Sequence, residues 1–447
     1  MPSWASDAIV YHLYPLGLCG APARNDFQSP PVSRLARLRG WTPHLRALGM
    51  NAVYLGPVFE SGTHGYDTAD YTRVDRRLGT NADLRQWRDE LHAAGIRLVV
   101  DTVFHHVGRD FWAFQDLRAR GEQSRYRDWF AGVDFRQRSP LGDAFAYETW
   151  RGHASLVKWN LRNPEVRAYL FGVVEGWISA FGIDGLRLDV AEDMDLDFLR
   201  ELAAWRHRVK PDLWLLGEAI HGDYRRLVNP QTLDSATNYE CYKGLYSSHN
   251  DRNYFEIAHS LHRQFGEGGL YKDLSLYAFV DNHDVDRIAS TLREPAHLVP
   301  LHVLLFGMPG VPSVYYGSEW GLQGRKHGGD DAPLRPALEA PGESPLTSLV
   351  ARLARIRHAT PALRRGSYRQ LFVASEQLAF AREHEGQRVL VAVNAAPTPA
   401  TLSLEAGRPE GSVFVDALDP SASFRVRDGR LPLEGLAPRS GRILVPA

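Results

Sequence analysis

Apolar residues along most of this chain recur in two alternating patterns. Short continuous apolar runs predict buried strands, and apolar residues at helical spacing predict the buried faces of helices. The predicted strands are residues 8–14, 51–56, 95–101, 181–190, 213–218, 235–238, 274–280 and 311–316. The helical segments between them include residues 33–48, 81–94 and 163–180, with Asn81 as the expected cap of the second. Strands alternating with helices in this way indicate an α/β fold, a parallel (β/α)8 TIM barrel. A doubly wound open sheet is the alternative, but no Gly-x-Gly-x-x-Gly turn follows the first strand.

Two segments depart from this alternation. Residues 107–158 are rich in arginine and aromatic residues and show no clean period, which predicts a short excursion domain after the third strand. Residues 366–447 contain short β-rich runs separated by proline and glycine, which predict a C-terminal antiparallel β-sandwich domain. The barrel itself is therefore expected to comprise residues 1–106 and 159–365.

The fourth predicted strand carries two charged residues within an apolar run. Arg187 and Asp189 are two positions apart, so both side chains should lie on one face of the strand, where they can pair. Such pairing favours the charged form of Asp189, because a neighbouring positive charge lowers the pKa of a carboxyl group. An ionised, oriented carboxylate at the end of a buried strand is suited to act as a nucleophile. A purely structural ion pair is the alternative.

Polar residues also follow three other predicted strands, which end in Asp101-Thr-Val-Phe-His-His106, Gly217-Glu218 and Asp281-Asn-His-Asp284. The carboxyl ends of the strands form the active-site face of such a barrel. Glu218 has no arginine beside it in sequence, so we expect it to be the protonated partner and general acid. One acid and one nucleophile are the requirement of retaining glycoside hydrolysis, and Asp284 would bind the sugar hydroxyls more tightly in the transition state.

The adjacent histidines raise the question of a metal site. Neighbouring residues on a strand point to opposite sides, so His105 and His106 should not reach one ion. We therefore expect no zinc site and no other cofactor. His106 and His283 are instead predicted to donate hydrogen bonds to substrate oxygens, and a structural role is the alternative for either one taken singly.

The amino-acid composition limits the classes of partner and the cellular compartment that we expect for this protein. Lysine and arginine total 52 against 53 acidic residues, a balance that favours neither a nucleic acid nor an anionic membrane as partner. Cys19 and Cys241 are the only cysteines, and we expect two free thiols, consistent with a reducing compartment. Neither a signal peptide nor an apolar run of membrane-spanning length is recognisable, so the expected location is the cytoplasm.

The four strand-end stretches resemble, in order and spacing, the four short sequence regions of the α-amylase superfamily of retaining glycosidases. Tyr11-His-Leu-Tyr-Pro15, His64-Gly-Tyr-Asp67 and Tyr315-Tyr-Gly-Ser-Glu319 are similar to further motifs of that superfamily. The resemblance implies a nucleophile, an acid/base and a transition-state stabiliser, which are Asp189, Glu218 and Asp284 respectively. It also implies substrate-binding residues, which are Tyr66, His106, Arg187, His283, Asp331 and Arg335.

Within the superfamily, the excursion and Leu156-Val-Lys-Trp-Asn160 resemble those of the cyclomaltodextrinase, neopullulanase and maltogenic amylase group. Members of that group usually carry an N-terminal β domain that builds their dimer, whereas this sequence starts at the barrel. We therefore expect a monomer or a weak homo-oligomer. Many relatives have a calcium-binding asparagine where this chain has His105, so no calcium is expected there.

The resemblance implies a hydrolase that cleaves α-1,4 bonds of maltooligosaccharides or starch-like α-glucans with retention. A transglycosylase, a sugar isomerase or an α-1,6-acting glucosidase would use the same carboxylates, so these alternatives stay open. A catalytically inactive barrel that serves as a binding or transporter-associated subunit would have lost the carboxylates and would carry a membrane span. This chain has all three carboxylates and no such span.

Overall fold

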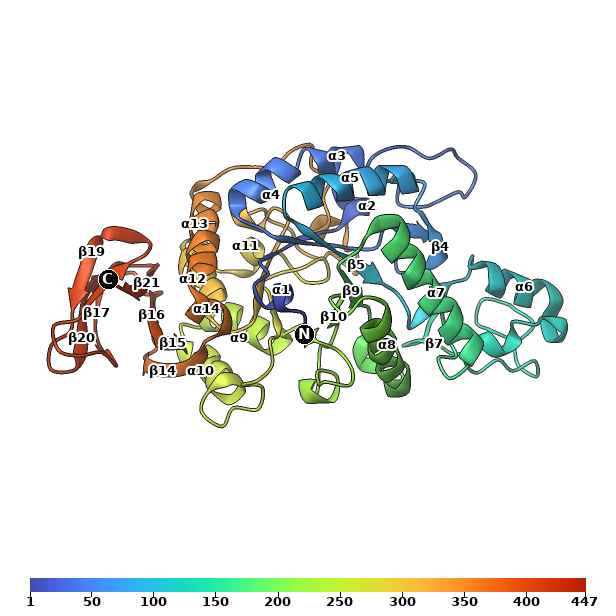
Figure 1. The fold of residues 1–447 in the computed structure, drawn as a ribbon. Helices are drawn as coiled ribbons and strands as arrows, with labels where there is room; N and C mark the ends of the chain where they lie inside the picture. The colour runs from blue at the N-terminus through green and yellow to red at the C-terminus, as the bar shows by residue number, and fades with distance from the viewer.

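The computed structural model describes residues 1–447, and its central element is a barrel of eight parallel strands (Figure 1). In sequence order these strands are β1 (Val10–Leu13), β2 (Ala52–Leu55), β5 (Arg97–Thr102), β9 (Gly185–Leu188), β10 (Trp214–Gly217), β11 (Ser235–Ala236), β12 (Tyr277–Ala278) and β13 (Val311–Tyr315). Their spatial order is β11-β10-β9-β5-β2-β1-β13-β12. A single parallel bridge between Thr237 and Tyr277 joins the two outermost strands and closes the barrel. The predicted (β/α)8 fold is confirmed.

Each barrel strand is shorter than the apolar run that predicted it. The run 274–280 contributes only Tyr277 and Ala278 to the sheet, because the following Phe279 and Val280 are buried without ladder partners. Inward-facing side chains of alternate strand positions, including Tyr54, form a separate apolar cluster inside the barrel. The barrel is thus a packed core whose open ends carry the loops.

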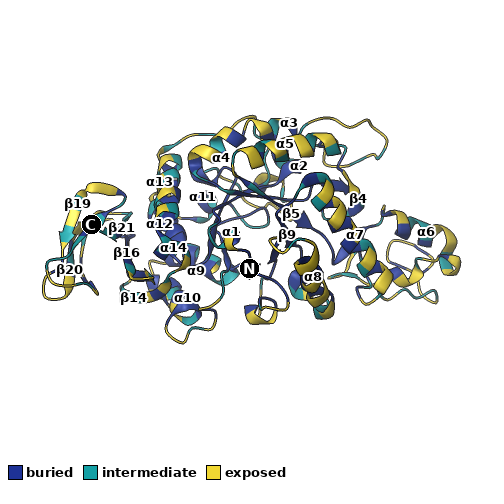
Figure 2. Ribbon diagram, viewed as in Figure 1, coloured by how far each residue is buried: buried dark blue, intermediate teal, exposed yellow.

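The main helices of the barrel are α3 (Ala36–Arg39), α4 (Thr42–Leu48), α5 (Asn81–Ala93), α7 (Pro164–Phe181), α8 (Leu196–Val209), α9 (Tyr239–Asn250), α10 (Tyr254–Phe265), α12 (Leu298–Gly307) and α13 (Pro345–Ala359). Shorter helices are α1 (Ser3–Ser6), α2 (Pro15–Leu18), α11 (Ile288–Thr291) and α14 (Pro361–Arg365). Figure 2 shows their exposed faces outward and the barrel strands buried at the centre. No helix is long and apolar enough to cross a bilayer.

Two predicted helix features are wrong in detail. The single helix expected over 33–48 is split into α3 and α4, because Pro43 cannot donate a backbone hydrogen bond to the preceding turn. The cap of α5 is Thr80 rather than Asn81. Thr80 accepts a hydrogen bond from the backbone of Asp83, whose carboxylate accepts the Thr80 N–H at 2.7 Å in a capping box.

The loop after β2 contains an antiparallel hairpin of β3 (Phe59–Ser61) and β4 (Thr68–Val74), with Tyr66 in its connection. After β5 the chain leaves the barrel. It forms α6 (Trp112–Arg120) and an antiparallel sheet of β6 (His106–Gly108), β8 (His153–Lys158) and β7 (Thr149–Trp150), at one end of the molecule in Figure 1.

The C-terminal strands lie at the opposite end of the molecule (Figure 1). They are β14 (Ser367–Val373), β15 (Gln377–His384), β16 (Gln387–Asn394), β17 (Ala400–Glu405), β18 (Val413–Asp416), β19 (Asp419–Arg425), β20 (Arg430–Leu436) and β21 (Ser440–Pro446). All their pairings are antiparallel, and an apolar cluster distinct from that of the barrel lies between them. The expected C-terminal antiparallel domain is confirmed. We propose domain boundaries at residues 107, 159 and 366, because the two non-barrel sheets begin within a residue or two of the first and last.

Candidate active site

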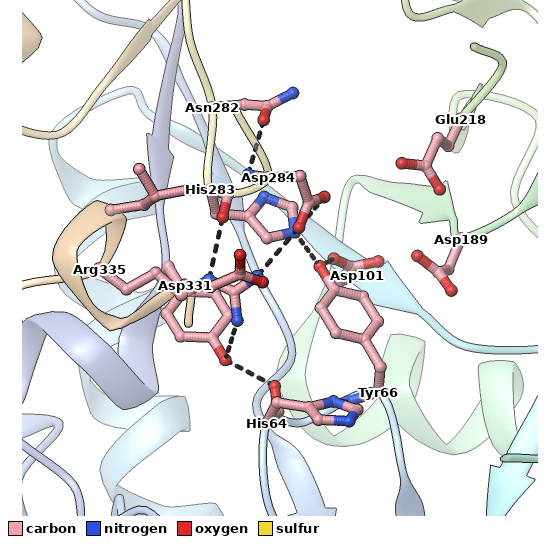
Figure 3. Close-up of polar contacts among 12 residues, drawn as sticks. His64, Tyr66, Asp101, Asp189, Glu218, Asn282, His283, Asp284, Asp331 and Arg335 are labelled. Atoms are coloured by element: carbon pink, nitrogen blue, oxygen red, sulfur yellow. Dashed lines mark hydrogen bonds and ion pairs between the residues drawn. The ribbon is translucent and has the colours of Figure 1, made fainter. Parts of the chain in front are cut away.

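A cavity of about 640 Å³ opens at the carboxyl ends of the barrel strands. Seven of the nine residues singled out from the sequence line it, namely Tyr66, His106, Asp189, Glu218, Asp284, Asp331 and Arg335. Arg187 and His283 do not line it but contact residues that do. The structure therefore brings all nine residues into one group, most of which Figure 3 shows.

Arg187 is the charged centre beneath the cavity. Its Nη1 lies 2.7 Å from Oδ1 of Asp189 and 3.1 Å from Oδ1 of Asp101, and its Nη2 lies 2.8 Å from Oε1 of Glu218. The predicted Arg187–Asp189 pair is present. Glu218 has no arginine beside it in sequence but contacts one in the structure, because the parallel register of β5, β9 and β10 brings all three carboxylates to one guanidinium.

This arrangement changes the electrostatics expected for Asp189. Burial and the adjacent Glu218 carboxylate raise the pKa of Asp189, and Arg187 only partly opposes the shift. The expectation that the arginine keeps this pKa low is therefore wrong for the site without substrate. Three buried carboxylates face one guanidinium, and the excess negative charge around Asp189 favours its protonated form.

Val190 links these two carboxylates through the backbone. It adopts φ +52°, which is unusual for a β-branched residue, and its N–H donates a hydrogen bond of 2.9 Å to Oε2 of Glu218. Both oxygens of Glu218 thus accept from nitrogen donors. No sequence signal indicated this conformation, because β-branched residues such as valine rarely adopt it.

The Asp284 carboxylate is held from two sides. Its Oδ2 lies 3.0 Å from Nε2 of His283, and its Oδ1 accepts a 2.9 Å hydrogen bond from Arg335. Burial alone raises the pKa of Asp284, but His283 and Arg335 together bring it below its usual range. Asp284 is therefore an ionised hydrogen-bond acceptor at the cavity wall.

Arg335 also binds Asp331 at 3.0 Å and the main-chain oxygen of His283 at 2.9 Å, and its guanidinium lies over the ring of Tyr14. Asp331 in turn contacts Lys326 at 2.9 Å. Tyr14 and Lys326 were not identified from the sequence.

Tyr66 links Asp101, which binds Arg187, to His283, which binds Asp284. Its hydroxyl donates to Oδ2 of Asp101 at 2.9 Å and contacts Nε2 of His283, and its ring is parallel to the His283 ring within 10°. Its position on the cavity wall is fixed by the β3–β4 connection. The hydroxyl is thus occupied, and the ring is the part of Tyr66 available to a ligand.

The expectation that His105 and His106 point to opposite sides is wrong. Their Nδ1 atoms lie 3.2 Å apart, because β5 ends at Thr102 and the alternation of a strand does not extend to them. Burial lowers the pKa of His106 to about 3 and that of His105 to about 4, so both rings are neutral. Nε2 of His106 is buried without a partner in the protein, and the residue forms part of the cavity wall.

No cluster of three or more histidine, cysteine, aspartate or glutamate side chains is arranged to hold a metal ion. Cys19 and Cys241 are buried free thiols. Other residues at the cavity wall that were not identified from the sequence are Trp150, Arg151, Glu192, Tyr239 and Tyr242. They come from the excursion, from the loop after β9 and from the first turn of α9, where no strand-end pattern marks them.

Comparison with known proteins yields consistent matches. A family model described as the alpha amylase catalytic domain matches residues 37–352, and one described as the maltogenic amylase C-terminal domain matches residues 368–440. The chain is 32% identical to neopullulanase 2 of Thermoactinomyces vulgaris, over 99% of this chain and 78% of that protein. It is 31% identical to a cyclomaltodextrinase of a Bacillus species, over 92% and 77% of the two chains. The ligand-free structure of cyclic alpha-maltosyl-(1→6)-maltose hydrolase from Arthrobacter globiformis superposes with a TM-score of 0.82, 26% identity and full coverage of both chains.

Proposed function

The chain belongs to the α-amylase family of glycosidases, and we propose that it hydrolyses α-1,4-glucosidic bonds of maltooligosaccharides or starch-like α-glucans with retention of configuration. The observation that carries this proposal is the bridging of Asp189 and Glu218 by one guanidinium, that of Arg187, beneath the cavity. Two carboxyl groups bound to neighbouring nitrogens of one arginine favour the short separation of retaining enzymes, about 5 Å, over the wider one that admits a water molecule.

The reaction follows from these positions. An oxygen of Asp189 attacks the anomeric carbon, the bond from that carbon to the glycosidic oxygen breaks, and this oxygen takes the proton of Glu218. The product is a glycosyl ester of Asp189. The Glu218 carboxylate then removes a proton from water, whose oxygen attacks the same carbon and releases Asp189 as a carboxylate.

Before the first step the proton has to be on Glu218, and Asp189 has to be ionised. Substrate favours this location, because a glycosidic oxygen facing Glu218 accepts a hydrogen bond only from the protonated carboxyl group. Asp189 is then left as the anion that attacks. Arg187 stabilises that anion while it remains within reach of Glu218.

The remaining residues bind the sugar. Asp284 and Asp331, both oriented by Arg335, supply acceptors for hydroxyl groups, and His106 supplies its ring at the cavity wall. His283 does not line the cavity and instead orients Asp284 through Nε2. The ring of Tyr66 offers an apolar face to the pyranose ring. Because hydrogen bonds to the hydroxyls strengthen as the ring flattens, Asp284 is assigned to transition-state stabilisation.

Product analysis on maltotriose, with the anomeric form of the first product followed by proton NMR, tests the proposal. We expect the α anomer from the wild type, and a loss of about 10³-fold or more in Asp189→Asn and Glu218→Gln. The exposed Asp212→Asn is the matched control. Initial release of the β anomer, or full activity of Asp189→Asn, would overturn it. Longer or isomeric products would indicate transglycosylation or isomerisation in place of hydrolysis. Release of maltotriose from pullulan, with maltotriose itself left intact, would indicate cleavage of α-1,6 bonds.

The expected cytoplasmic location and the expected monomeric or weakly oligomeric state are kept as parts of this proposal. Fractionation of the source cells and light scattering test them directly.

A further inference from the structure

The tip of the β7–β8 hairpin reaches the wall of the active-site cavity. Trp150 pairs with His153, so the connection is a two-residue turn formed by Arg151 and Gly152, with φ of +45° and +86°. Turns of this kind favour glycine, asparagine or aspartate at both positions. An arginine at the first position is conformationally costly, and such strain concentrates at sites where the side chain has a function.

The Arg151 side chain crosses from the excursion to the loop after β9. Its Nη2 lies 3.0 Å from Oε1 of Glu192 and 3.4 Å from Oδ2 of Asp193. Glu192 is the better partner, because its side chain is only 14% exposed whereas that of Asp193 is 41% exposed. The hairpin tip is thus connected to the barrel by a bond to Glu192.

Glu192 uses its other oxygen on the loop after β10. Oε2 accepts hydrogen bonds from the main-chain N–H groups of Ile220 at 2.8 Å and His221 at 3.0 Å. The N–H of Glu192 also donates to the main-chain oxygen of Glu218 at 3.3 Å. Glu192 therefore holds the segment that carries Glu218, from the main-chain carbonyl group of Glu218 to the N–H of His221 three residues later.

This network lies at the end of the cavity occupied by Glu218. Figure 3 shows Glu218 and Asp189 on one side of the site and Arg335 and Asp331 on the other. A proton donor faces the leaving group, so the Glu218 side receives the departing sugar. Arg151 and Trp150 both line the same cavity.

We propose that Glu192 is a positioning residue for Glu218, and that Arg151 at the hairpin tip holds Glu192 in place and so couples the excursion to protonation of the leaving group. The inference rests on the proposed role of Glu218 as the proton donor. It requires no contact between Glu192 and the substrate.

A pair of substrates separates positioning from general structural support. Departure of a sugar from maltotriose needs the proton of Glu218, whereas departure of fluoride from α-maltosyl fluoride does not. For Glu192→Ala we expect kcat on maltotriose to fall by about tenfold or more, because misplacing a catalytic group by about an ångström costs this much. The first-turnover rate of fluoride release should stay within about threefold of the wild type.

Two further variants and one control complete the experiment. Glu192→Gln keeps an oxygen for the N–H groups of Ile220 and His221, so it should recover most of the lost kcat. Arg151→Ala, which changes a half-exposed side chain, should give a smaller loss on maltotriose and none on the fluoride. Arg136→Ala removes another exposed ion pair of the excursion, with Asp134, and should change neither rate.

Glu218→Gln serves as the reference for the proposed function. If this variant loses activity equally on maltotriose and on the fluoride, Glu218 is not the proton donor and the proposed function fails. If Glu218→Gln loses only maltotriose but Glu192→Ala affects both substrates equally, or neither, then the positioning role of Glu192 is refuted while the proposed function stands.

Discussion

The main-chain N–H of Val190 donates to Oε2 of Glu218 at 2.9 Å, so the residue that follows the proposed nucleophile also holds the proposed proton donor. Val190 itself adopts φ +52°, a left-handed conformation, at the point where the chain leaves β9. The relative placement of the two carboxyl groups is therefore fixed by backbone as well as by Arg187.

Substitutions at Val190 should separate the hydrogen bond from the side chain. Val190→Gly keeps the N–H and accepts a positive φ without strain, so kcat on maltotriose should stay within about threefold of the wild type. Val190→Pro removes the donor and cannot adopt a positive φ, so kcat should fall by about 100-fold. Equal activity of the two variants, in preparations with native circular dichroism, would contradict this role of the backbone.

Removal of the buried cation should destabilise the protein in a pH-dependent way. Arg187→Met leaves Asp101, Asp189 and Glu218 without their guanidinium, at a cost of about 3–5 kcal/mol in the free energy of unfolding at pH 7. The buried carboxyl groups then take up protons more readily in the folded state than in the unfolded chain. The loss of unfolding free energy in Arg187→Met should therefore become smaller as the pH falls from 7 to 5. Denaturant unfolding at each pH measures it. Arg136→Met is the matched control, and a deficit that grows on acidification would disprove the account.

Buried neutral histidines should make the fold sensitive to acid. Burial lowers the pKa of His302 to about 4, whereas a histidine in the unfolded chain titrates near about 6.5. Between these values the unfolded state binds a proton that the folded state excludes, so stability falls as the pH falls.

In His302→Gln the loss of unfolding free energy between pH 7 and pH 5 should be smaller by about 2 kcal/mol. Denaturant titrations at the two pH values check this, with His259→Gln on the exposed face of α10 as the control. An unchanged pH dependence in His302→Gln would show that this histidine is not excluded from protonation in the fold.

The fold and the composition of the site followed from local sequence patterns. Strand ends marked by carboxylates and histidines identified six of the nine residues that the structure gathers, because parallel strands of a barrel must end on the same face. The family resemblance added the other three, which are Tyr66, Asp331 and Arg335. Contacts between side chains on neighbouring strands could not be predicted in the same way. The bond from Arg187 to Glu218 depends on the register of β9 against β10, which no local pattern encodes.

Other features depend on backbone conformations that are unfavourable for the residue types found there. Valine at 190 and arginine at 151 both occupy positive φ, and the surrounding structure imposes these values. Glu192 has no motif at all, and its importance is visible only when the loops after β9 and β10 lie together. The misplaced cap of α5 has a simpler origin, since Thr80 and Asn81 are both good caps and Asp83 selects the first.

The closure of the barrel has a consequence for its internal motions. The seam between β11 and β12 consists of two strands of two residues each, joined by one bridge at Thr237 and Tyr277. Regions held by few backbone hydrogen bonds open at the lowest free energy, so amide protons along this seam should exchange with solvent before those of β1, β2 and β5. Tyr239 begins the helix directly after the seam and lies in the cavity wall. The most weakly paired strands of the barrel thus border the cavity, and opening between them would widen it on the side of Tyr239.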